Sequence, residues 1–153
     1  MRLCCDVLQC LQGETLVTAE SCTGGGIGQA LTAVPGSSAV YKGGIICYTN
    51  WVKETVLNVP GTVLEQEGAV SAAVAKAMAE GARSLLQADT AVSVTGLAGP
   101  GGDDYGHPVG TVFIGYSDAN QTLASEYHFS GCRDEVRTMA IRSALELVLE
   151  MNK

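Results

Sequence analysis

The stretch TAESCTGGG at residues 18–26 places a carboxylate, hydroxyls and a thiol where a short β-prone run gives way to three glycines. Glycines directly before a helix leave backbone N–H groups free at the positive end of the helix dipole, so this turn predicts an anion or oxyanion site. Ser21 lies at the edge of the turn. Because a serine hydroxyl is a weak nucleophile alone, a base has to come from elsewhere in the chain.

Lys53 is the strongest candidate for that base, since it follows the next predicted strand and Tyr48 precedes it closely. Neither of the two histidines lies at a suitable position. A lysine accepts a proton only when it is neutral, and its ordinary pKa is about 10.4. Burial beside another cation would lower that pKa, and Arg133 or Arg137 is the candidate cation.

A third polar strand end lies in VTGLAGPGG at 94–102, where Thr95 is followed by four glycines within seven residues. Such a run indicates close approach of the backbone to a ligand or to another segment. Ligands of open α/β sheets bind outside the carboxyl ends of the strands. The three strand ends are therefore expected to form one pocket.

Each of these residues also has an ordinary structural interpretation. Ser21 and Thr23 can cap the following helix, which is the commoner role for either residue alone. Lys53 can be a solvated helix lysine, and Glu20 can accept backbone N–H bonds at a turn. Cys22 is more typical of a small buried side chain than of a nucleophile. The convergence of polar residues on the strand ends is what favours a site.

The alternation of helical and strand patterns predicts an α/β fold, a three-layer αβα sandwich of one domain over residues 1–153. The sheet is expected to be mostly parallel, with an antiparallel hairpin at one side. The expected order is roughly αβαβα(α)αβββα. Strands are expected at 15–19, 43–48, 90–96, 110–118 and 122–129. Helices are expected at 3–12, 27–34, 51–59, 68–86 and 133–151, with a break at 60–61 and Ser71 as a cap.

Composition and charge narrow the function classes. The formal net charge of −7 argues against a nucleic-acid partner. The six cysteines form no C-x-x-C pair and the histidines lie apart from them, so neither a metal nor another cofactor is expected. No apolar run is long enough for export or for spanning a bilayer. We expect reduced thiols, a cytoplasmic location and no membrane partner.

Six motifs occur in a fixed order along the chain: TAESCTGG (18–25), VPGSS (34–38), GG-x-x-x-Y-x-N-x-x-K (43–53), GAVS (68–71), VTGLAGPGG (94–102) and PVGTV (108–112). With these motifs the chain resembles the CinA C-terminal domain family, the nicotinamide-nucleotide amidases, over nearly its whole length. The resemblance implies hydrolysis of nicotinamide mononucleotide to nicotinic acid mononucleotide and ammonia, a step of pyridine-nucleotide recycling that needs no metal. It also implies that the protein self-associates as a homo-oligomer.

The resemblance also assigns roles to residues. Ser21 matches the nucleophile, Lys53 the base and Tyr48 its tyrosine neighbour, and Thr95 falls where the family has serine or threonine. The segment 131–137 matches a late arginine region, in which we favour Arg133 over Arg137 as the functional residue. The substrate phosphate is expected either against the glycine-rich turn of 96–102 or at an arginine of the last helix. The expected substrate-binding residues are Glu20, Thr23, Gly24, Gly25, Gly96, Gly99, Arg133 and Arg137. Backbone N–H groups of residues 23–25, together with Thr95, are expected to stabilise the oxyanion.

One departure from the family pattern is Cys132, where an acidic residue is expected in many relatives. Loss of that acid would weaken substrate binding if it orients Arg133. This keeps open a second class of function, a nucleotide-binding regulatory module without turnover. A hydrolase that uses Cys22 as its nucleophile is a third alternative. Because Ser21 and Lys53 are both present, amide hydrolysis is the favoured interpretation.

Overall fold

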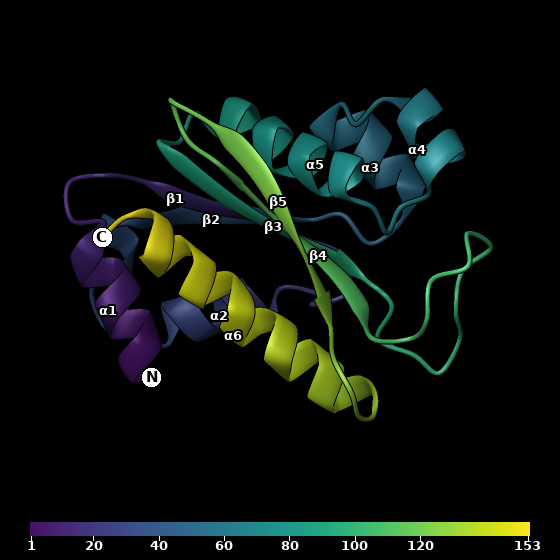
Figure 1. Cartoon of the computed structure of the whole chain (residues 1–153). Helices are drawn as coiled ribbons and strands as arrows, with labels where there is room; N and C mark the ends of the chain where they lie inside the picture. The colour runs from purple at the N-terminus through teal and green to yellow at the C-terminus, as the bar shows by residue number, and fades with distance from the viewer.

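A five-stranded sheet forms the middle layer of the computed structural model, which describes all residues from 1 to 153 (Figure 1). The strand order is β2-β1-β3-β4-β5. The strands are β1 (Leu16–Glu20), β2 (Tyr41–Ile46), β3 (Thr90–Gly96), β4 (Thr111–Ser117) and β5 (Thr122–His128). Strand β1 runs parallel to β2 and β3, whereas the β3–β4 and β4–β5 pairs are antiparallel. The predicted mixed sheet with a hairpin at one side is confirmed.

Helices cover both faces of this sheet. They are α1 (Arg2–Cys10), α2 (Gly26–Thr32), α3 (Asn50–Leu57), α4 (Gly61–Glu67), α5 (Ala72–Leu85) and α6 (Arg133–Met151), with a 3₁₀ turn at Ser37–Ala39. Figure 1 shows α1, α2 and α6 on one face and α3, α4 and α5 on the other. None of the helices combines the length with the apolar character that a membrane span requires. The arrangement is the predicted αβα sandwich.

Two large hydrophobic clusters, one on each face of the sheet, hold the layers together. Side chains alternate along a strand, so Leu16 packs into the core beneath α6 while its neighbour Val17 packs into the core beneath α5. All five residues of β1 are buried because this strand lies inside the sheet and is covered on both faces. A buried β1 fixes the position of the polar turn that follows it.

Some element boundaries differ from the sequence prediction, and one difference affects the site. Strand β2 begins and ends two residues earlier than expected, so Tyr48 lies beyond the strand in the connection to α3. The segment after Pro60 is a short helix, α4, rather than only a break; proline is well tolerated at a helix start. Helix α5 begins after the expected cap, because Ser71 Oγ accepts the N–H of Val74 at 3.3 Å.

Candidate active site

Ser21 and Lys53 are brought together at the carboxyl end of the parallel strands. Ser21 is the first residue after β1, and Lys53 lies in the first turn of α3. Lys53 Nζ lies 2.9 Å from Ser21 Oγ and donates a hydrogen bond to the carbonyl oxygen of Cys47 at 2.7 Å. Only 1% of Lys53 and 8% of Ser21 is exposed. The pair is therefore shielded from bulk water although both side chains line a cavity.

Burial lowers the pKa of the Lys53 ammonium group. A thiolate at Cys47 or Cys22 would oppose this shift, but burial raises the pKa of each of these thiols to about 11. Both cysteines are thus neutral near pH 7. Lys53 Nζ donates to Ser21 Oγ and to the Cys47 carbonyl oxygen, and once it loses a proton its lone pair can accept the Ser21 proton while the bond to Cys47 remains.

The expectation that an arginine lowers the Lys53 pKa is wrong, since desolvation is the cause. Both guanidinium groups are bonded elsewhere. Arg137 Nε donates to the carbonyl oxygen of Cys22 at 3.0 Å, and Arg137 Nη2 donates to that of Thr23 at 3.3 Å. Arg137 therefore braces the turn after β1 and does not line the cavity, whereas Arg133 does.

Glu20 does not face the cavity, which corrects its assignment as a substrate-binding residue. Its Oε1 accepts the N–H of Ile27 at 2.8 Å and its Oε2 accepts the N–H of Gly28 at 3.1 Å. The expected anion site at the start of α2 is consequently occupied by the protein's own carboxylate. Glu20 is only 2% exposed, and the helix dipole and the two amides compensate its buried charge.

The turn after Ser21 retains free backbone donors. The N–H of Gly24 donates to the Ser21 carbonyl oxygen at 3.1 Å, while the N–H groups of Cys22, Thr23 and Gly25 have no acceptor in the chain. Of these residues only Cys22 lines the cavity, so its amide is the best placed to meet a ligand. The Thr23 hydroxyl is fully buried and has no hydrogen-bond partner. Gly24 and Gly25 shape the turn, with φ of +59° and +97°.

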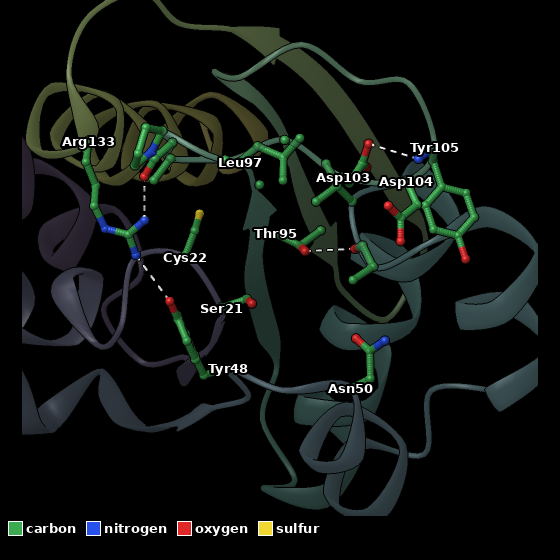
Figure 2. Close-up of a pocket in the computed structure, with 18 of the residues that line it drawn as sticks. Ser21, Cys22, Tyr48, Asn50, Thr95, Leu97, Asp103, Asp104, Tyr105 and Arg133 are labelled. Carbon is green, nitrogen blue, oxygen red and sulfur yellow. Dashed lines mark hydrogen bonds between the residues drawn. The ribbon is translucent and has the colours of Figure 1, made fainter.

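Tyr48 bonds Arg133 rather than Lys53. Arg133 Nη2 donates to the Tyr48 hydroxyl at 3.1 Å, and Arg133 Nη1 donates to the carbonyl oxygen of Gly99 at 2.7 Å (Figure 2). The guanidinium group thereby links the connection after β2 to the loop after β3. This contact differs from the expected one, in which Tyr48 is a direct neighbour of the lysine.

The third strand end supplies the opposite side of the cavity. Thr95 Oγ1 donates its proton to the carbonyl oxygen of Ala69 at 2.8 Å, so this hydroxyl is already engaged and is not a free oxyanion donor. Gly96 and Gly99 line the cavity as expected. A Cβ at Gly96 would lie 2.6 Å from Val112 Cγ2, which explains the glycine by close packing against β4.

The cavity has a volume of about 600 Å³ and is lined by residues that sequence reasoning left without a role. The polar ones among them are Asn50, Asp103, Asp104 and Tyr105. Asn50 belongs to the Y-x-N-x-x-K motif, which was a usable signal. The other three follow the glycine run of the loop after β3, where no periodicity indicates the direction of a side chain.

Fold and geometry together define an α/β domain with a buried serine–lysine pair at the ends of its parallel strands. Residues 4–152 match the CinA C-terminal domain. A CinA-like protein of Synechococcus sp. (strain RCC307) is 51% identical over 146 residues, covering 93% of this chain and 35% of the relative. For a CinA-like protein of Geobacter metallireducens the identity is 50% over 134 residues, with 88% and 32% covered. The chain belongs to the CinA C-terminal domain family and spans about a third of the length of these relatives.

Solved structures agree with this assignment. The competence/damage inducible protein CihA from Agrobacterium tumefaciens superposes with a TM-score of 0.95 at 40% identity, covering 99% of this chain and 94% of that chain. A CinA superfamily protein from Klebsiella pneumoniae gives a TM-score of 0.94 at 34% identity, with 97% and 94% covered.

Proposed function

We propose that the chain is an amidohydrolase that converts nicotinamide mononucleotide into nicotinic acid mononucleotide and ammonia, a step in pyridine-nucleotide recycling. The observation that carries the proposal is the 2.9 Å contact between Lys53 Nζ and Ser21 Oγ, buried beside the cavity. A hydroxyl next to an uncharged amine is a nucleophile with its base. The choice of substrate rests on the family resemblance carried by the motifs that contain both residues.

The reaction proceeds in two halves. Ser21 Oγ attacks the carboxamide carbon as neutral Lys53 takes the hydroxyl proton. The tetrahedral intermediate then collapses, the C–N bond breaks, and the lysine returns that proton to the leaving nitrogen, which departs as ammonia. Water attacks the resulting Ser21 ester with Lys53 again as the base, releasing the carboxylic acid and restoring the serine.

Charge that develops on the carboxamide oxygen is stabilised by backbone N–H groups of the turn after Ser21. Cys22 lines the cavity and its backbone N–H has no backbone acceptor, so we assign this amide as a donor. Loss of one such donor typically costs about 3 kcal/mol of transition-state stabilisation. Arg133, on the cavity wall, is the residue we assign to the phosphate, because a guanidinium group binds phosphate in a bidentate manner.

The test is ammonia release from nicotinamide mononucleotide. We expect Ser21→Ala to lower kcat by at least about 1,000-fold, while Ser84→Ala, an exposed serine of α5, retains the parental rate. In the parent, kcat/KM should rise with pH as Lys53 loses its proton in the free enzyme. A Ser21→Ala protein that keeps its activity within about tenfold of the parent rules out a serine nucleophile.

Two other outcomes separate the alternatives. Binding of the nucleotide by the parent protein without any ammonia release would identify a regulatory module. Cys22→Ala should remain active, because the Cys22 thiol is neutral at pH 7 and a thiol is a far weaker nucleophile than a thiolate. If a folded Cys22→Ala protein is inactive, the Cys22 thiol becomes the candidate nucleophile.

A further inference from the structure

The walls of the cavity differ in charge on the two sides of Ser21. Figure 2 shows Arg133 and Tyr48 on one side of the serine, and Asp103, Asp104 and Tyr105 on the other. All of them line the same cavity. A ligand whose reacting carbon lies at Ser21 therefore has a cation on one side and carboxylates on the other.

The two carboxylates are not equivalent, because Asp103 is engaged within its own loop. Its Oδ1 accepts the N–H groups of Tyr105 and His107, each at 3.1 Å, and its Oδ2 contacts His107 Nδ1 at 2.7 Å. Burial acts to raise the pKa of Asp103, but these hydrogen bonds outweigh burial and hold the pKa below its ordinary value. Asp103 is a structural residue that shapes the loop from 97 to 110.

Asp104 has no such engagement. Its carboxylate forms no hydrogen bond and no ion pair with the rest of the chain, and Figure 2 shows it facing the cavity. Its neighbours are anchored on both sides, since the Tyr105 hydroxyl donates to the carbonyl oxygen of Glu65 in α4 at 2.7 Å. The Tyr105 ring also packs on Gly68, where a Cβ would come within 2.6 Å of Tyr105 Cδ2. These contacts fix the backbone of the loop on either side of Asp104, whose own side chain is exposed at the mouth of the cavity.

We propose that Asp104 is a specificity-determining residue that selects pyridine nucleotides whose ring carries a fixed positive charge. This inference rests on the proposed function. Attachment of ribose to the ring nitrogen gives the pyridine a permanent cation that no change of pH removes. Such a substrate is dipolar, with its phosphate suited to Arg133 and its ring suited to Asp104. A nucleotide of the same shape with an uncharged ring gains nothing from this carboxylate.

The test compares binding of nicotinamide mononucleotide with binding of its reduced form, in which the ring is uncharged while ribose and phosphate are unchanged. Measurements use the Ser21→Ala background, so that hydrolysis does not interfere. We expect this protein to bind the oxidised form more tightly. Adding Asp104→Asn should raise the Kd of the oxidised form about 3- to 10-fold and leave that of the reduced form within about twofold.

Glu80→Gln in the same background is the matched control, because it removes one negative charge from an exposed position of α5 outside the cavity. It should change neither Kd. Equal weakening of both nucleotides by Asp104→Asn would mean that Asp104 contacts the ribose or holds the loop, and would overturn the inference. An unchanged Kd for the oxidised form would overturn it as well. Absence of both nucleotide binding and turnover in the parent would instead reject the proposed function, and the inference with it.

Discussion

Lys53 is a charge-bearing side chain that is 1% exposed, and its burial opposes folding at neutral pH. Its pKa in the folded protein lies below the unfolded value. Between these two pKa values the unfolded chain binds a proton that the folded chain does not, so stability rises with pH across this window. The free-energy cost of burying the Lys53 charge is largest below the pKa of the folded protein. It vanishes above the pKa of the unfolded chain, which is about 10.4.

We therefore expect Lys53→Met to abolish ammonia release and to raise the free energy of unfolding by about 0.5–2 kcal/mol at pH 7. The gain should shrink between pH 7 and pH 10, as measured by denaturant unfolding at each pH. Lys76→Met, at an exposed position of α5, changes the net charge equally and should show no such pH dependence. A pH-independent effect of Lys53→Met would mean that the buried lysine retains an ordinary pKa.

At the residue scale, the sequence predicted that Ser21 and Lys53 lie together, which the structure shows, but not which way Glu20 points. Ser21 and Lys53 each follow a strand end, and parallel strands place such ends together. Glu20 lies beside Ser21 in sequence but bonds the start of α2, since adjacent residues at a strand end point to opposite faces. The sequence pattern around residue 20 does not reveal on which side of the strand end the cavity lies.

Among the elements, agreement with the predicted bounds does not simply follow periodicity. Helix α6 and strand β3 lie at the predicted residues, whereas the amphipathic helix α5 begins four residues later than predicted because Ser71 caps it. Strand β2 was misplaced by two residues, since its two glycines interrupt the alternation. The loop after β3 was recognised as glycine-rich, but the cavity-facing direction of Asp104 depends on the anchoring of Tyr105 to α4, a contact between distant segments.

The start of α6 is a second element-scale feature, because Cys132 is its N-cap residue. Glu135 Oε1 accepts the N–H of Cys132 at 3.3 Å, but a thiol is a weaker acceptor for helix N–H groups than a hydroxyl or carboxylate. We expect Cys132→Ser to raise the free energy of unfolding by about 0.5–1 kcal/mol. Thermal unfolding at pH 7 measures this gain in stability. The control is Cys132→Ala, which offers no acceptor and should give no gain. Equal effects of the two substitutions would mean that capping by residue 132 does not contribute to stability.

Across the whole molecule, the candidate site depends on how the layers pack, since Ser21 directly follows a strand of the sheet and Lys53 lies in a helix of the covering layer. Helix α3 packs on α5, and their contact is close at Gly81. A Cβ at Gly81 would overlap the carbonyl oxygen of Leu57, the last residue of α3. The glycine therefore sets the distance between the two helices.

This packing makes Gly81→Ala a test of whether layer spacing governs the chemistry. Helix propensity alone favours alanine by about 1 kcal/mol, whereas overpacking against a backbone atom costs about 1–3 kcal/mol. We expect a net loss of stability in denaturant unfolding and a fall in kcat/KM of about tenfold or more, because a displaced α3 carries Lys53 away from Ser21. Ser84→Ala, one turn further along α5, should leave both quantities unchanged. If Gly81→Ala instead stabilises the protein at full activity, the spacing of α3 and α5 does not control the serine–lysine contact.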